Sequence, residues 1–93
     1  MKIMAICGSG LGSSFMVEMN IKKVLKKWEL EAEVDHADLS SATPGAADLF
    51  VMAKDIADSA SVPAEQVVVL SNIIDINELE SKLHDYFSSR SLL

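Results

Sequence analysis

Residues 2–14, KIMAICGSGLGSS, decide the fold of this chain. The stretch opens with a short apolar run, residues 2–6, which stops at a cluster of glycines and serines. An uninterrupted apolar run of this length is typical of a strand that is buried on both faces. Ser13 and Ser14 are good N-terminal caps for a helix. Apolar residues then recur with helical spacing at Val17, Ile21, Val24 and Trp28. We therefore predict a strand, a loop of small residues and a helix from about residue 14 to residue 28.

The rest of the chain alternates strands and helices in the same way. Residues 31–35 alternate polar and apolar side chains, which is typical of an edge strand, and residues 36–47 form a polar connection. Residues 49–53 and 67–70 are apolar and predict two more buried strands. The remaining helices are expected at about residues 55–60 and from about Asp75 to Phe87, the latter opened by an Asp75–Glu78 capping box.

This order of elements predicts an α/β fold. Apolar strands that alternate with helices indicate a parallel sheet that is covered on both faces, because each crossover places a helix on one face. We expect an open four-stranded sheet in the order 2-1-3-4, a Rossmann-like three-layer sandwich. One domain spans residues 1–88, and residues 89–93 form a frayed tail. Ligands of such sheets bind at the carboxyl ends of the strands where the strand order reverses, and Cys7 lies there.

Composition excludes several classes of protein. The 93 residues carry a net charge of −6, whereas a nucleic-acid-binding domain of this size is normally basic. No apolar run approaches the roughly 18 residues that a membrane span needs, and the N-terminal run is too short for a secretory signal, so we expect a cytoplasmic protein without direct membrane insertion. A single cysteine excludes an internal disulfide, a CxxC redox centre and a cysteine-rich zinc site. We expect no metal and no cofactor.

The loop of small residues has the chemistry of an anion cradle. Its glycines let consecutive backbone N–H groups point inward, and the following helix adds the positive end of its dipole. Such N–H groups also stabilise a thiolate, so a cysteine at the mouth of the loop becomes a nucleophile. We predict Cys7 as the catalytic residue. The predicted phosphate-binding residues are Gly8, Ser9, Gly10, Leu11, Gly12, Ser13 and Ser14.

The residues of this loop argue against four alternative interpretations. A purely structural role for the cysteine and the turn is less favoured, because the loop follows a predicted strand and precedes a predicted helix, as a phosphate-binding loop does. A Walker A loop needs a lysine, and none stands between Cys7 and Asn20. The spacing of Gly8, Gly10 and Gly12 differs from the dinucleotide pattern GxGxxG. A cysteine phosphatase loop has an arginine six positions after the cysteine, where this chain has Ser13.

The opening stretch resembles a known family. Residues 3–14, IMAICGSGLGSS, are similar to the IIB component of the bacterial phosphoenolpyruvate-dependent sugar phosphotransferase system (PTS), in the lactose/cellobiose-like superfamily and closest to the ascorbate-type proteins. The resemblance implies that Cys7 accepts a phosphoryl group from a phosphohistidine on a IIA protein. It further implies that Cys7 passes this group to a sugar, ascorbate-type or similar, that is bound by the membrane component IIC.

Other residues are candidates for supporting roles. Lys54 and Asp55 follow the third strand, and Lys54 can stabilise the charge of a phosphocysteine or simply be solvated. Phe15, Met16 and Met19 follow the loop. Methionines at helical spacing usually pack in a core, although these three residues could also form an exposed docking surface for partners.

The two histidines are expected to be structural. His36 ends the second strand and is interpreted as a loop residue, although the chemistry of histidine also allows a general base or a second phosphoryl carrier. His84 is expected on the surface. Two functions remain as alternatives to the phosphocarrier: a small cysteine phosphatase or arsenate-reductase-like enzyme, and a non-catalytic anion-binding module.

Overall fold

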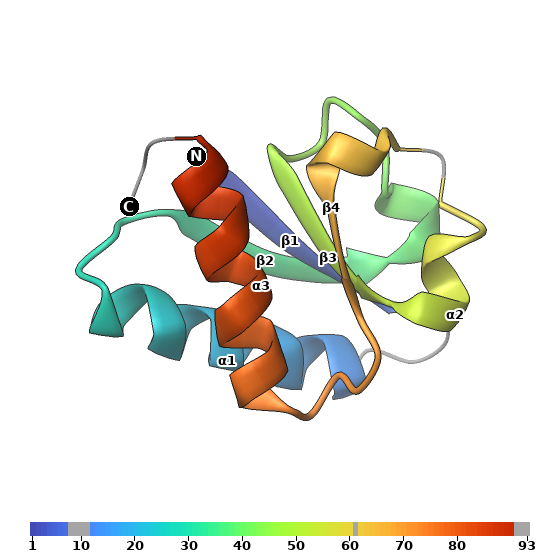
Figure 1. Cartoon of the computed structure of the whole chain (residues 1–93). Coiled ribbons are helices and arrows are strands. Elements are labelled where there is room, and N and C mark those ends of the chain that lie inside the picture. Colours follow the sequence, from blue (N-terminus) through green and yellow to red (C-terminus); the bar gives the residue numbers. More distant parts are fainter. Residues whose placement is uncertain (8–11, 61, 91–93) are drawn as a thin grey trace.

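The computed structural model describes residues 1–7, 12–60 and 62–90, with the backbone alone for residue 7 and residues 12–14. It shows a parallel sheet between two helical layers (Figure 1). The strands are β1 (Lys2–Cys7), β2 (Glu33–Asp38), β3 (Leu49–Ala53) and β4 (Val67–Leu70). The α-helices are α1 (Gly12–Lys27), α2 (Lys54–Ala57) and α3 (Ile76–Ser89), and short 3₁₀ turns cover Leu39–Ser41 and Ala64–Gln66.

The predicted sheet topology is confirmed. The strand order is β2-β1-β3-β4, and all neighbouring strands are parallel. The chain runs from β1 to one side for β2 and then crosses back to the other side for β3. The strand order therefore reverses between β1 and β3, where a parallel sheet offers a crevice to a ligand.

The two faces of the sheet carry separate hydrophobic clusters. On one face, α1 and α3 pack against alternate residues of the strands, among them Ile3, Val51 and Leu70. On the other face, Met4, Phe50 and Met52 pack against the segment that contains α2. Because β1 and β3 are buried on both faces, almost all of their residues are apolar. This composition is what predicts these segments as strands from the sequence.

Three predicted boundaries are wrong. β2 begins at Glu33, whose amide donates to the carbonyl of Met1 over 2.9 Å, and it runs on to Asp38, so His36 lies within the strand. The helix expected at residues 55–60 is the single turn α2. The expected tail begins later, because Ser89 belongs to α3 and Arg90 lies over the ring of Tyr86. Residues 91–93 lie outside the described residues.

Helix α1 ends in a Schellman motif. The amide of Leu30 donates to the carbonyl of Leu25 over 2.9 Å, and the amide of Glu29 donates to the carbonyl of Lys26 over 3.2 Å. Glu29 has a φ of 57°, the left-handed conformation that this motif requires and that glycine adopts most easily.

Glu29→Gly should therefore stabilise the protein. The left-handed conformation costs a residue with a Cβ atom about 1 kcal/mol, which glycine does not pay. We expect the melting temperature to rise by a few degrees in a calorimetric scan. Glu29→Ala serves as the control, because alanine keeps the Cβ atom; a rise of equal size in that variant would contradict the explanation.

The start of α3 is held by two carboxylates. The side chain of Asp75 caps the helix by accepting from the amides of Asn77 and Glu78, as predicted. The predicted reciprocal bond of a capping box is wrong, because the carboxylate of Glu78 instead accepts from the amides of Ser71 and Asn72 over 2.8 and 2.9 Å. Glu78 thereby fixes the turn that follows β4 to the first turn of α3.

Glu78 makes the stability of the fold depend on pH. The amide of Ser71 above all, and then Lys82 and the amide of Asn72, lower the pKa of Glu78 from 4.5 to about 2. Since the folded pKa is below the unfolded one, the stabilisation is complete above about pH 4.5 and is lost as the pH falls toward 2. We expect Glu78→Gln to lower the melting temperature by several degrees at pH 7, and the difference from the parent to shrink below pH 4.5. Glu31→Gln, at an exposed position, is the matched control; an equal effect at both positions would argue against this role.

Candidate functional site

The carboxyl ends of the four strands meet at one edge of the sheet. Cys7 is the last residue of β1 and pairs in register with Asp38, the last residue of β2. On its other side, Ile6 pairs with Met52, the residue before the end of β3, and Ala53 pairs with Leu70 at the end of β4. Cys7 therefore lies at the carboxyl edge of the sheet, at the point where the strand order reverses.

Helix α1 begins close to Cys7 in sequence. Gly12 is its first residue, five positions after Cys7, and Ser13 and Ser14 lie in its first turn. A helix N-terminus presents unpaired N–H groups and a positive dipole end to any anion in front of it. The predicted phosphate-binding residues Gly8, Ser9, Gly10 and Leu11 lie outside the described residues, so the cradle itself stays a prediction.

Lys54 and Asp55 lie at the same edge of the sheet. They form the first turn of α2, directly after β3, and both are exposed. Together with Ala53, Asp58 and Ser71 they line an open hollow of about 430 Å³. The sequence thus correctly placed Lys54 and Asp55 next to the reversal point, but their part in phosphate binding stays a prediction.

The residues that follow the loop form an exposed apolar surface. Phe15, Met16 and Met19 are 50%, 46% and 44% exposed. The favoured interpretation, that they fill gaps in the core, is therefore wrong, because Val17 and Ile21 turn the buried face of α1 toward the sheet. We call Phe15, Met16 and Met19 the α1 patch. It lies on the first two turns of the helix that begins beside Cys7.

The sequence did not predict the buried carboxylate of Glu18, which lies next to the α1 patch. Glu18 is 7% exposed, and its two oxygens contact Nδ1 of His36 on β2 and, at 2.7 Å, Nζ of Lys22. Burial alone raises the pKa of Glu18, but the hydrogen bonds from Lys22 and His36 outweigh it and hold the pKa below its ordinary value. The spacing of Glu18 and Lys22 signals a helical pair, whereas the contact with His36 could be found only once the register of β2 was known.

His36 links β2 to the α1 patch. Its ring lies edge-on to the ring of Phe15, with 5.6 Å between the centroids. Its place in the strand, paired with Ala5, sets it two residues before the level of Cys7. His36 is therefore a residue that joins α1 to the edge of the sheet rather than a loop histidine. His84 is exposed, as predicted.

One cluster of the described residues has the ligand types of a metal site. Side-chain atoms of Glu18, Asp35 and His36 lie within 4.8 Å of one another. The ammonium group of Lys22 lies 2.7 Å from Glu18, and Nδ1 of His36 lies 3.9 Å from Asp35, so these side chains also form a group of ion pairs.

The sequence is similar to a known protein family and to one bacterial protein. Residues 2–85 match the family model described as "PTS system, Lactose/Cellobiose specific IIB subunit". The ascorbate-specific PTS system EIIB component of Mycoplasma pneumoniae is 26% identical over 85 residues, which cover 87% of this chain and 88% of that protein.

A solved structure shares the fold. It is the solution structure of a low molecular weight protein tyrosine phosphatase from Bacillus subtilis, with a TM-score of 0.60 and 19% identity. The match covers 98% of this chain and 99% of that one. At this level of identity the likeness shows the fold alone. Among the described residues, no helix is both long and apolar enough to cross a bilayer.

Proposed function

Because this chain belongs to the lactose/cellobiose-specific IIB family of the PTS, a family of phosphotransferase components, we propose that Cys7 is the residue that carries the phosphoryl group. The observation that supports this most is the position of Cys7, at the end of β1 and five residues before the N-terminus of α1. The N–H groups at a helix N-terminus favour negative charge, which suits a residue that carries a phosphoryl group.

The proposed reaction consists of two transfers. In the first, the thiolate of Cys7 attacks the phosphorus atom of a phosphohistidine on a IIA protein, and the bond from phosphorus to the imidazole nitrogen breaks. In the second, a hydroxyl group of a sugar attacks the phosphorus and gives its proton to solvent, and the bond to sulfur breaks, which returns the thiolate. In this proposal the sugar is held by a membrane IIC component and the chain acts in the cytoplasm. The ascorbate-specific relative makes ascorbate the first substrate to try.

The sequence of the loop fits a carrier better than a hydrolase. Ser13 stands where a cysteine phosphatase loop has its arginine, so the loop has no guanidinium to stabilise the transition state of hydrolysis. A thiophosphate formed at Cys7 should therefore persist until an acceptor arrives.

The likeness to a tyrosine phosphatase fold raises phosphatase activity as the second candidate. We expect no steady turnover of p-nitrophenyl phosphate by the isolated protein, because the loop lacks an arginine to stabilise the transition state. The measurement is continuous release of p-nitrophenol, with Cys7→Ala as the blank. Sustained release that depends on Cys7 would replace the carrier proposal by the phosphatase.

The α1 patch is the proposed docking surface for the phosphohistidine donor. Its exposed phenylalanine and methionines begin three residues after the first residue of α1, so a protein that delivers a phosphoryl group to Cys7 has to come close to them. Methionine side chains adapt to differently shaped surfaces, which suits a carrier that meets a donor and an acceptor in turn.

A further inference from the structure

The two edges of the sheet are β2 and β4. An edge strand presents unpaired peptide groups, and these can pair with a strand of another chain. β4 is the edge that is more prone to such pairing, because its sequence is Val67-Val68-Val69-Leu70, an uncharged segment with high β-propensity.

The two edges differ in the protection that their own side chains provide. β2 carries exposed carboxylates at Glu33, Asp35 and Asp38, and edge charges of this kind oppose pairing. β4 carries no charged side chain of its own. Val68 and Leu70 belong to the cluster under α1 and α3, while Val67 packs against the cluster on the opposite face. Because three of its four side chains are packed and the fourth, Val69, is uncharged, any charge at this edge comes from a neighbouring element.

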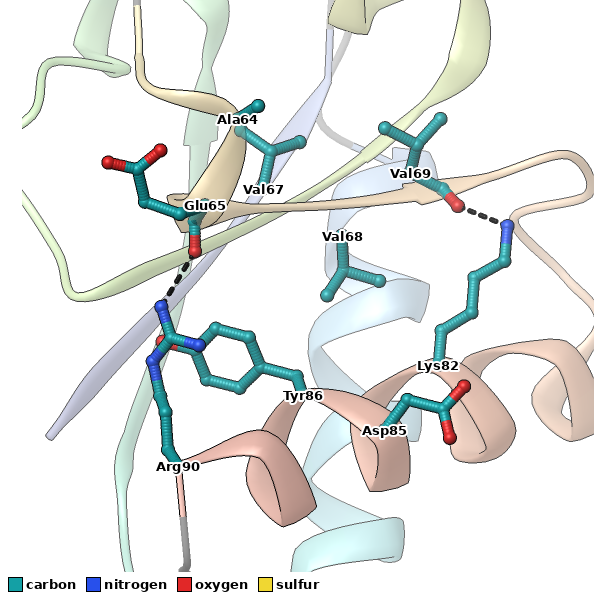
Figure 2. Close-up of a pocket in the computed structure, with 9 residues that line it drawn as sticks. All are labelled: Ala64, Glu65, Val67, Val68, Val69, Lys82, Asp85, Tyr86 and Arg90. Carbon is teal, nitrogen blue, oxygen red and sulfur yellow. Dashed lines mark hydrogen bonds between the residues drawn. The ribbon is translucent and has the colours of Figure 1, made fainter.

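Helix α3 supplies two cations to this edge. Nζ of Lys82 donates to the carbonyl oxygen of Val69 over 2.5 Å, and the guanidinium of Arg90 donates to the carbonyl oxygen of Glu65 over 2.9 Å (Figure 2). Each of these side chains makes a second contact with a residue of α3. Lys82 pairs with Glu78 at 2.9 Å, and Arg90 lies 4.0 Å from the centroid of the Tyr86 ring.

The two acceptors lie on neighbouring parts of the chain. Val69 is in β4 itself, whereas Glu65 is in the 3₁₀ turn Ala64–Gln66 that leads into the strand. The two cations therefore bond one carbonyl of the strand and one carbonyl of the turn before it. They lie beside a groove of about 490 Å³ that Val68 and Tyr86 also line (Figure 2).

We propose that Lys82 and Arg90 prevent the β4 edge from pairing with a second copy of this chain. Without them, two β4 strands can align across a two-fold axis and join two sheets into one, because the same edge then meets itself. A second copy is the occupant that fits, since two uncharged valine-rich strands bring no charge into the new ladder.

The test is the state of association of the Lys82→Met, Arg90→Met double variant in sedimentation velocity over a range of concentrations. We expect this variant to self-associate at concentrations where the parent sediments unchanged. The Lys23→Met, Lys26→Met double variant is the matched control. It removes two cations from exposed positions of α1 and should sediment like the parent. If the double variant does not keep the circular dichroism spectrum of the parent, each single variant gives the same comparison.

A third substitution locates the new contact. The carbonyl of Val69 faces outward, so its amide does as well, and proline there removes an outward donor without removing a bond to β3. Val69→Pro added to the Lys82→Met, Arg90→Met variant should restore the sedimentation of the parent. The proposal is overturned if the double variant sediments like the parent, or if it associates and Val69→Pro leaves that association unchanged.

Discussion

We expect the replacement of Cys7 by serine to abolish phosphoryl transfer and to leave the fold intact. This is the largest effect that the account predicts. A serine hydroxyl at neutral pH is almost wholly protonated and is a far weaker nucleophile than a thiolate. Serine nevertheless keeps the size and the position of the side chain at the end of β1. We expect transfer from a phosphorylated IIA protein to fall below detection, while the melting temperature stays within about 2 °C of the parent.

The two readouts of Cys7→Ser separate three interpretations of the residue. Lost transfer with a parent-like melting curve indicates the nucleophile. A melting temperature that falls by many degrees would mean that Cys7 is chiefly a core residue, and the proposed role would be wrong. Transfer that persists in the variant would favour an anion-binding loop whose cysteine has no chemical part.

We expect the replacement of Phe15 by aspartate to slow transfer from the IIA protein at sub-saturating concentration by about tenfold to a hundredfold. Aromatic residues at the centre of an interface commonly contribute a few kcal/mol to binding, and a new carboxylate in the α1 patch would be buried on docking. Phe15 is half exposed, so its loss removes little packing from the free protein. A carboxylate near a helix N-terminus is also favourable for the helix dipole, which protects the fold of the variant.

The measurement for Phe15→Asp is the initial rate of phosphorylation of the chain against the concentration of IIA. A docking residue raises KM and leaves the rate at saturating IIA close to that of the parent. Ala64→Asp places the same charge at an exposed position in the 3₁₀ turn before β4, away from the carboxyl edge, and should behave like the parent. A KM for Phe15→Asp equal to that of the parent would dispose of the docking surface.

The sequence predicted the sheet because its central strands are buried on both faces. Such strands are almost wholly apolar, so residues 2–6 and 49–53 were recognisable, and the alternating strand was placed correctly at an edge. Residues 67–70 are equally apolar although β4 is the other edge of the sheet. The cap of α3 was predicted for a local reason, since an N-cap carboxylate acts on amides only two and three residues ahead.

The features that the sequence did not predict depend on contacts between segments that are far apart along the chain. The extent of β2 depends on a hydrogen bond between Glu33 and Met1, and the pair formed by Glu18 and His36 joins a helix to a strand. Neither contact has a sequence pattern of its own. The sequence favours a core position for Phe15 and the methionines of the α1 patch, because hydrophobicity alone does not distinguish a buried side chain from an exposed one.

The role of Cys7 is tested most directly by the intact mass of the protein after incubation with phosphoenolpyruvate and a desalted lysate of the source cells. The Cys7→Ala variant is treated alongside, and phosphorylation of the IIA protein is confirmed in the same mixture. The account predicts one added phosphoryl group on the parent, located by peptide mapping to Cys7, and none on the variant. An unmodified parent in the presence of phosphorylated IIA, or a phosphoryl group that remains on Cys7→Ala, would contradict it.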